Sequence, residues 1–351
     1  MTDLVPVTVL TGYLGAGKTT LLNRILTENH GKKYAVIVNE FGEVGIDNDL
    51  VVDADEEVFE MNNGCVCCTV RGDLIRILTG LMRRKGAFDA IIVETTGLAD
   101  PGPVAQTFFV DEEVRARTRL DSVTTVVDAK HVLLRLSDSR EAREQIAFAD
   151  QIVLNKTDLV SDDDLRMVEA RLRRLNPLAP IHRAQRSNVP LEAILGRGSF
   201  DLDRIVSLEP DFLNPAHGEP GHVHDEHCDH DHGHDHGHDH GHAHHEHDHV
   251  HDDDIKGVAL TLQTPLDGAK ITRWLNDILQ TQGPDILRAK GIMDVAGDDR
   301  RLVFQAVHMI LEGDFQRPWK PDEARYSRLV FIGRNLDEAA LRAGFEACAA
   351  A

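Results

Sequence analysis

The sequence lacks the features typical of a secreted, membrane-spanning or disulfide-stabilised protein. Only five cysteines occur among 351 residues, too few for a disulfide framework. The first ten residues contain no basic segment followed by a long apolar stretch, so we expect no signal peptide. No run of about 18 apolar residues appears, so we expect no membrane span. These absences favour a cytoplasmic protein in a reducing compartment.

Positive charge is also scarce. Lys and Arg number 38 against 59 Asp and Glu, which gives a formal net charge of −21. This balance argues against nucleic acid as a partner, because phosphate contacts need clustered cations. An acidic chain instead attracts cations and partners with basic surfaces. Hydrophobic residues make up 42% of the sequence, enough for a sizeable core, and the length suits two domains.

A histidine-rich segment divides the chain. Sixteen of the 20 histidines lie between His217 and His251, and residues 217–254 carry twelve Asp or Glu and no Lys or Arg. With almost no apolar side chains to bury, this segment cannot offset the entropy cost of becoming ordered. We therefore predict a disordered, metal-binding linker at residues 206–254, between one domain at residues 1–205 and a smaller one at residues 255–347.

Residues 1–205 alternate strand and helix patterns. Apolar runs predict buried parallel strands at residues 5–10, 34–38, 90–94, 123–128 and 151–155, with a weaker candidate at 58–61. Helical patterns follow several of these runs, at residues 18–28, 73–85, 101–109, 140–148 and 162–175. The alternation predicts an α/β fold with a doubly wound, mostly parallel sheet.

Residues 255–347 show a different order of patterns. Strand patterns occur at residues 257–263, 291–295, 301–307 and 328–332, and helical patterns at residues 268–280 and 336–348. A strand, a helix, further strands and a last helix within about 90 residues predict a small α+β domain.

A phosphate-binding pattern joins the first strand run to the first helical pattern. Residues 12–19, GYLGAGKT, fit G-x-x-x-x-G-K-[ST] in the strand–loop–helix context that this motif needs, which disfavours an incidental glycine-rich turn. Its backbone N–H groups can face phosphate oxygens, Lys18 can neutralise the β- and γ-phosphates, and the Thr19 hydroxyl can ligate Mg²⁺. The predicted phosphate-binding residues are Gly12, Gly15, Ala16, Gly17, Lys18, Thr19 and Thr20.

A carboxylate at the end of a neighbouring strand should help to hold the Mg²⁺ ion. The sequence supplies Glu94, and Gly97 follows it, where a close approach of the backbone to the γ-phosphate needs a small residue. We therefore predict Mg²⁺ ligands at Thr19 and Glu94, and catalytic roles for Lys18, Thr19 and Glu94. The alternative for Glu94 is a solvated carboxylate at a strand end.

Residues 155–158, N-K-T-D, close another strand run. An aspartate there can accept hydrogen bonds from N1–H and the 2-amino group of guanine, whereas adenine offers neither donor and would leave the carboxylate unpaired. The stem of Lys156 can lie over the base, and Asn155 can tie the loops together. We predict that Asn155, Lys156 and Asp158 read guanine, so the expected nucleotide is GTP; the alternative is a polar turn.

Three cysteines lie within four residues, at Cys65, Cys67 and Cys68. Thiolates suit Zn²⁺, so we predict a functional metal site. The alternatives are buried structural cysteines, a redox pair, which does not match the C-x-C-C spacing, and a structural zinc site, which needs a second ligand cluster. The loop at residues 39–47 offers carboxylates. It can face the nucleotide at one end and the metal at the other, which would couple the two.

Every second residue from His230 to His244 is histidine. Neutral imidazoles bind Zn²⁺, Co²⁺ and Ni²⁺, and the interspersed carboxylates attract cations. Because an unstructured tract offers many interchangeable ligand sets, we expect several labile sites; the alternative is a solvated linker without function. The histidines predicted to form these sites are His230, His232, His234, His236, His238, His240 and His242.

Five motifs follow one another along the chain: TGYLGAGKTTLLN, VNEFGEVGID, NNGCVCC, IIVETTGLADPGPVAQTFF and VLNKTD. In this combination the sequence resembles the CobW family of P-loop GTPases, and the stretches ILRAKGIMDV and YSRLVFIGRNLD resemble that family's C-terminal domain. The resemblance implies a P-loop GTPase domain at residues 1–205, a CobW C-terminal α+β domain at residues 255–347, and a metal site at C-x-C-C.

The resemblance also suggests further site residues. Some members of the family place a ligating carboxylate where this chain has Val38, so Glu40 and Glu43 are the candidates for the zinc ligand other than thiolate. Asp47 is the candidate for a switch-loop contact to Mg²⁺ or for positioning the attacking water.

We therefore expect a GTP-hydrolysing metallochaperone that binds zinc at the C-x-C-C site and transfers it to a client metalloprotein under GTP control, with Co²⁺ and Ni²⁺ as alternative ions. Two other hypotheses stay open. One is cobalt or iron delivery, for cobalamin synthesis or nitrile hydratase activation. The other is a metal-storage or buffering protein with incidental GTPase activity. The sequence predicts no oligomeric state.

Overall fold

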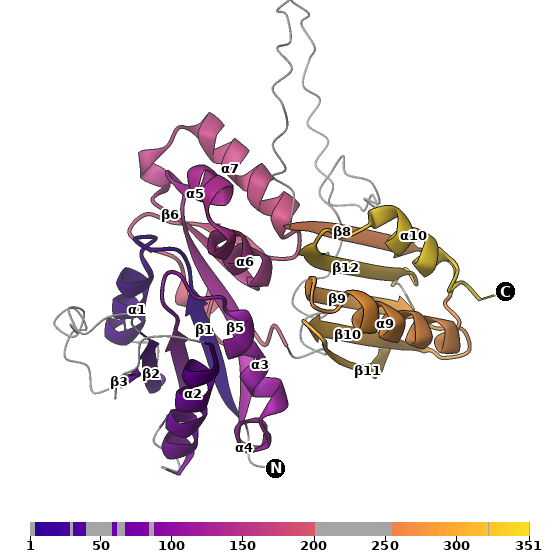
Figure 1. Cartoon of the computed structure of the whole chain (residues 1–351), viewed down its shortest axis with the longest axis horizontal. Coiled ribbons are helices and arrows are strands. Elements are labelled where there is room, and N and C mark those ends of the chain that lie inside the picture. Colours follow the sequence, from indigo (N-terminus) through magenta and orange to yellow (C-terminus); the bar gives the residue numbers. More distant parts are fainter. Residues whose placement is uncertain are drawn as a thin grey trace, which may run out of the picture.

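The computed structural model describes residues 4–28, 31–39, 58–61, 67–83, 88–200, 255–321 and 323–350. At residues 39, 58–61 and 67–71 it describes the backbone alone. The described chain forms two sheets, each flanked by helices (Figure 1). No helix in these residues is both long and apolar enough to cross a membrane.

The first sheet has seven strands in the order β3-β2-β4-β1-β5-β6-β7, and its strand pairs are parallel. The predicted strand runs are central in it, and every residue of β4 and β6 is buried, as expected for strands covered on both faces. The strands are β1 Val5–Thr11, β2 Tyr34–Asn39, β3 Val58–Met61, β4 Ala90–Glu94, β5 Thr118–Asp128, β6 Gln151–Asn155 and β7 Ile181–Arg183.

Helices cover both faces of this sheet. Leu10 and Val126 lie on one face, with the apolar side chains of α1 and of residues 184–194. Val9 and Val127 lie on the other face, with α2, α3, α5, α6 and α7. This alternation confirms the doubly wound α/β fold. The helices are α1 Lys18–Thr27, α2 Cys67–Met82, α3 Gly102–Val110, α4 Glu112–Arg115, α5 Val132–Asp138, α6 Arg140–Phe148 and α7 Asp162–Leu175.

The second sheet is antiparallel, with five strands in the order β11-β10-β9-β12-β8. One of its faces packs against α9 and α10 through residues such as Phe331 and Phe345. This arrangement confirms the predicted smaller α+β part. Its elements are β8 Ile255–Leu262, α9 Gly268–Gln282, β9 Ile286–Asp294, β10 Arg300–Val307, β11 Ile310–Pro318, β12 Ser327–Arg334 and α10 Glu338–Glu346.

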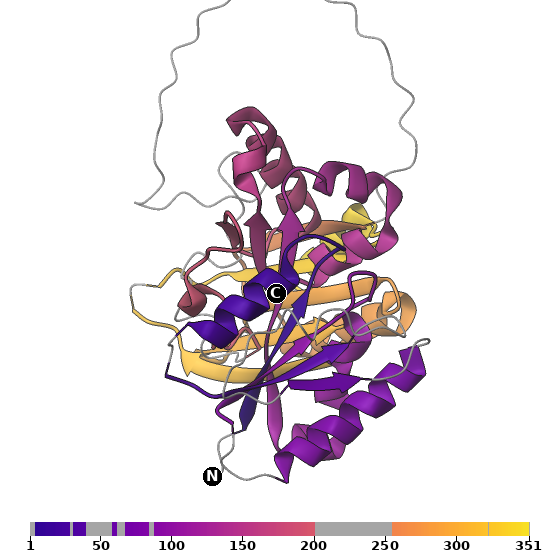
Figure 2. The ribbon, with the colours of Figure 1, turned by 90° about the vertical axis from the view of Figure 1, so that its left-hand side faces the viewer.

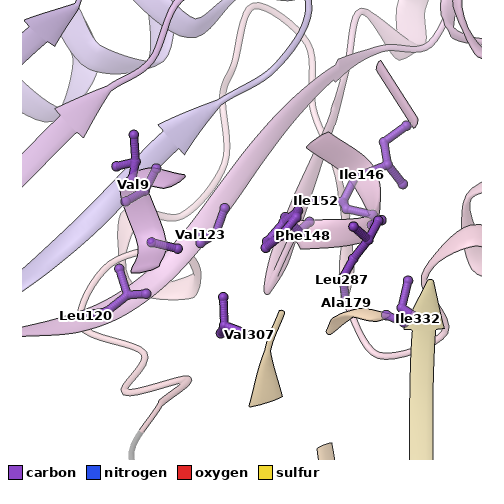
Figure 3. Close-up of a cluster of buried hydrophobic side chains, with 14 of the residues drawn as sticks. Val9, Leu120, Val123, Ile146, Phe148, Ile152, Ala179, Leu287, Val307 and Ile332 are labelled. Carbon is purple, nitrogen blue, oxygen red and sulfur yellow. The ribbon is translucent and has the colours of Figure 1, made fainter. Parts of the chain in front are cut away.

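The other face of the second sheet packs against the first part of the chain. Leu287, Val307 and Ile332 join the cluster that contains Ile146 and Phe148 of α6 (Figure 3). Turned by 90°, the strands of the second sheet lie behind the first sheet (Figure 2). The two sheets therefore share one continuous apolar core.

Buried charges also join the two parts. Asp150 Oδ1 accepts hydrogen bonds from Arg288, at 2.7 Å, and from Lys290 Nζ, at 2.9 Å. Arg288 also donates to the Phe148 carbonyl, and Lys290 to the Ser199 carbonyl. Burial alone would raise the pKa of Asp150, but the two cations outweigh it and hold that pKa below its ordinary value. The carboxylate therefore stays ionised between the two sheets.

The structure extends or adds several elements. β11 and α5 were not predicted, β5 begins at Thr118 and β9 at Ile286, and α2 begins at Cys67 rather than at residue 73. The predicted linker at residues 206–254 lies outside the described residues.

Candidate nucleotide-binding site

The loop between β1 and α1 has a backbone that requires glycine. Gly12 and Gly17 have φ of +140° and +111°, a region that disfavours side chains. A Cβ at position 12 would lie 2.2 Å from the Val126 carbonyl oxygen, and one at position 17 would lie 2.4 Å from Asn155 Nδ2. The two glycines therefore let the loop lie directly against the ends of β5 and β6.

Lys18 folds back over this loop. Its side chain is buried, and Nζ donates a hydrogen bond to the Gly12 carbonyl at 2.8 Å. The cation is therefore held at the loop, and it can exchange this carbonyl for phosphate oxygens. The sequence-predicted residues Gly15 and Ala16 complete the loop, and Thr19 and Thr20 lie in the first turn of α1.

The end of β4 lies beside the start of the loop. Glu94 is buried and is the register partner of Leu10 in β1. The Thr95 N–H donates to the Leu10 carbonyl at 2.9 Å, and Thr95 Oγ1 donates to Thr11 Oγ1 at 2.8 Å. The residues predicted to hold Mg²⁺, Thr19 and Glu94, offer a hydroxyl and a carboxylate oxygen, the hard ligands that this ion prefers.

Asn155 connects three segments of the site. Its Nδ2 donates to the Ala16 carbonyl at 2.9 Å and to Ser187 Oγ at 3.1 Å, and its Oδ1 accepts the Ser187 N–H at 2.7 Å. Ser187 Oγ in turn donates to the Gly17 carbonyl at 3.0 Å. Ser187 was not predicted from the sequence, where its local signal is a short polar stretch, QRSN, after β7.

Lys156 has a left-handed backbone, with φ of 62°, and its Nζ donates to Asp128 Oδ2 at 2.7 Å. Burial alone would raise the pKa of Asp128, but hydrogen bonds from Lys156 and His131 outweigh it and lower that pKa. Asp158 follows on a 3₁₀ turn, η1 Thr157–Leu159, with its side chain exposed. Asn155 and Lys156, two of the three residues predicted to read guanine, thus lie next to the phosphate-binding loop.

A cavity of about 440 Å³ adjoins the phosphate-binding loop. It is lined by the loop, the carboxyl end of β5, and helices α5 and α6, with Tyr13, Asp128 and Gln145 among its polar walls. The Arg135 guanidinium lies over the Tyr13 ring, 5.4 Å from its centroid.

The predicted metal-binding residues lie largely outside the described chain. Cys67 and Cys68 open α2, where the backbone alone is described. No group of three or more His, Cys, Asp or Glu that could hold a metal occurs within the described residues. The predicted residues outside the description are Glu40, Glu43, Asp47, Cys65 and the histidines at positions 230, 232, 234, 236, 238, 240 and 242.

The described backbone nevertheless shows where β2 and β3 end, directly before residues 40 and 62. Val38 is the register partner of Glu94, and Asn39 is the register partner of Met61. β2 and β3 therefore both end at the edge of the sheet where Glu94 and the phosphate-binding loop lie.

The parallel sheet, the G-x-x-x-x-G-K-[ST] loop and the N-K-x-D turn at a nearby strand end define a P-loop protein of the GTPase class. The family model "CobW/HypB/UreG, nucleotide-binding domain" matches residues 6–183. The model "Cobalamin synthesis protein cobW C-terminal domain" matches residues 255–349. The chain belongs to the CobW/HypB/UreG family of P-loop GTPases and carries the CobW C-terminal domain, which confirms the resemblance seen in the sequence.

Known proteins match nearly the whole chain in sequence, and one of them also in structure. The zinc chaperone YjiA of Escherichia coli is 35% identical over 346 residues, which cover 97% of this chain and 98% of that protein. The zinc chaperone CobW of Pseudomonas aeruginosa is 36% identical, with 96% and 89% covered. The crystal structure of Zn(II)-bound YjiA GTPase from E. coli superposes with a TM-score of 0.75 at 31% identity, covering 99% of this chain and 100% of that one.

Proposed function

We propose that this protein is a GTP-hydrolysing zinc chaperone. It binds GTP at the phosphate-binding loop, carries Zn²⁺ at Cys65, Cys67 and Cys68, and transfers the ion to a client metalloprotein. The observation that carries this proposal is the similarity to two zinc chaperones over nearly the whole chain. A reducing cytoplasm would keep the three thiols available for metal.

The residues around the loop suit GTP. Asp158 would accept hydrogen bonds from guanine, and the stem of Lys156 would lie against the base. Lys18, which now contacts the Gly12 carbonyl, would move to the β- and γ-phosphates. Thr19 and Glu94 would hold Mg²⁺, which supplies charge neutralisation at the phosphates. Asp47 remains the candidate for orienting the attacking water.

The positions of the β2 and β3 ends support a coupling between nucleotide and metal. Residues 40–57 carry Glu40 and Glu43, and residues 62–66 carry Cys65. The first segment follows the end of β2, which pairs with β4 beside Glu94, and the second follows the end of β3, which pairs with β2. A change in occupancy of the γ-phosphate position can therefore act on both. A tenfold change in zinc affinity needs about 1.4 kcal/mol of coupling, within the usual range for allostery.

The histidine tract supports a role in collecting metal. Its labile sites would hold Zn²⁺ close to the thiolate site at high local concentration. The tract also favours the alternative of a metal buffer, in which the histidines bind nearly all of the metal. Co²⁺ and Ni²⁺ would bind the same imidazoles, so metal competition has to be measured at the thiolate site.

A zinc titration of the protein lacking residues 217–251 tests the proposal. We expect one tight site to survive the deletion, with an affinity that differs between the GDP complex and a complex with a non-hydrolysable GTP analogue. Adding Cys67→Ser and Cys68→Ser should abolish that site, whereas Cys348→Ser, at a buried free cysteine, is the matched control. Loss of all zinc binding on deletion would instead support the buffer.

A further inference from the structure

A buried amide holds the loop that follows Glu94. Gln145, in α6, is only 1% exposed. Its Nε2 donates hydrogen bonds to the carbonyl oxygens of Gly97 and Ala99, both at 3.1 Å. A single –NH₂ group thus uses both of its hydrogens on one short loop, residues 97–99.

This loop lies directly on the phosphate-binding loop. A Cβ at position 97 would lie 2.8 Å from the backbone nitrogen of Leu14 and 2.6 Å from its Cδ2 atom. The Ala99 N–H donates to the Thr96 carbonyl at 3.1 Å, which closes a turn. Because the carbonyl and the following N–H of a trans peptide point in opposite directions, holding the Gly97 carbonyl also fixes the direction of the Leu98 N–H.

The helix that carries Gln145 is itself fixed at both sides. The Gln145 carbonyl accepts a hydrogen bond from Thr125 Oγ1 of β5 at 2.8 Å. The neighbouring Glu144 forms ion pairs with Arg140 of α6 and with Arg334 of the second sheet. The amide is therefore presented from a rigid support.

We propose that Gln145 is a positioning residue for GTP hydrolysis: it holds the peptide groups of residues 97–99 against the phosphate-binding loop. The inference rests on the GTPase activity of the family and is independent of zinc transfer. A loop without this clamp would sample orientations in which its peptide groups are misplaced for the reaction. The expected cost therefore falls on the chemical step rather than on nucleotide binding.

The test compares Gln145→Met, which keeps the shape but removes both donors, with Thr118→Val. The control removes a buried hydrogen bond, from Thr118 Oγ1 to the Val114 carbonyl, at the opposite end of β5 from the phosphate-binding loop. For Gln145→Met we expect kcat for GTP to fall about tenfold or more, with KM for GTP and Kd for GDP within about twofold of the wild type. Thr118→Val should keep kcat while it lowers Tm by about as much as Gln145→Met does.

A second test of the hydrogen-bonding role is the pH dependence of kcat in the variant Gln145→Glu. In Gln145→Glu an ionised carboxylate faces the two carbonyl oxygens and repels them, whereas the protonated form can donate one hydrogen bond. Its kcat relative to the wild type should therefore rise as the pH is lowered, and that of Gln145→Met should not. A flat ratio would refute the hydrogen-bonding role.

The outcomes separate this inference from the proposed function. A normal kcat in Gln145→Met, or an equal loss in Thr118→Val, would overturn the positioning role while leaving zinc transfer intact. A parallel loss of GDP affinity would show that Gln145 supports the nucleotide site as a whole, and would overturn the role as well. Zinc titration of the same variants reports on the chaperone separately.

Discussion

Replacing Asp150 by asparagine should greatly weaken the association of the two sheets. The side chains of Arg288 and Lys290, 3% and 6% exposed, both donate to Asp150 Oδ1, and the Val123 N–H donates to Oδ2. Asparagine has one acceptor oxygen, so either the two cations or the Val123 N–H would face an –NH₂ group. Removing one partner of a buried ion pair costs about 3–5 kcal/mol, a large part of a typical stability of about 5–15 kcal/mol.

Urea unfolding of Asp150→Asn, followed by the fluorescence of Trp274 and Trp319 in the second part of the chain, measures this cost. The matched control is Asp163→Asn, whose ion pair with Arg166 is exposed and should contribute about 1 kcal/mol or less. Adding Lys290→Met to Asp150→Asn should restore part of the stability, because one fewer cation is buried without a partner.

The Asp150 carboxylate also makes the stability of the protein depend on pH. Because the folded pKa of Asp150 lies below its ordinary value, the contribution of this carboxylate to the free energy of unfolding is complete above about pH 4. It is lost as the pH falls through the folded pKa.

A loss of unfolding free energy below about 1 kcal/mol for Asp150→Asn, or one equal to that of Asp163→Asn, would refute the assignment of this ion cluster as a major link between the sheets.

Three further predictions concern the site and its contact with the second sheet. Lys18→Ala should lower the rate of GTP hydrolysis, measured by phosphate release, by about 10²-fold or more, because the lysine would neutralise charge that develops on the phosphates. An unchanged rate would exclude this loop as the site of GTP hydrolysis. Asp158→Asn should weaken GTP binding, measured by calorimetry, by about 1–3 kcal/mol, while ATP binding stays weak; equal binding of GTP before and after the change would refute guanine reading. Burial and the nearby Arg334 lower the pKa of His308, although Glu144 acts in the opposite direction. The folded protein therefore favours the neutral imidazole, and its free energy of unfolding should fall as the pH drops below about 6.5. The free energy of unfolding of His308→Asn should depend less on pH over this range.

The sequence predicted the strands that are buried on both faces, because an uninterrupted apolar run is a local signal. It missed β11, whose residues are half-exposed or exposed and which pairs only with β10 at the edge of the sheet. It also shortened β5, where the buried Asp121 accepts hydrogen bonds from the N–H groups of Arg197 and Gly198. Such partners lie more than 70 residues away and leave no local pattern.

In the candidate site, too, residues with a local sequence signal were predicted and residues that act through distant contacts were not. The phosphate-binding loop and the N-K-T-D turn were recognised because their residues are contiguous and their chemistry depends on local spacing. Ser187 and Gln145 were not recognised, because they act through hydrogen bonds to the backbone of distant loops. Only the order of the strands brings these loops together, and a serine or glutamine in a polar stretch is not distinctive.

The shared core limits how a nucleotide signal can reach the second sheet. A free swing of that sheet would expose the apolar contacts of Leu287, Val307 and Ile332 and separate Asp150 from its cations. Smaller shifts of the elements between the sheets avoid that cost. The loop that Gln145 holds leads directly into α3, where a Cβ at Gly102 would lie 2.7 Å from His308 Nε2 on the β10–β11 turn. A movement of this loop would therefore alter a contact with the second sheet.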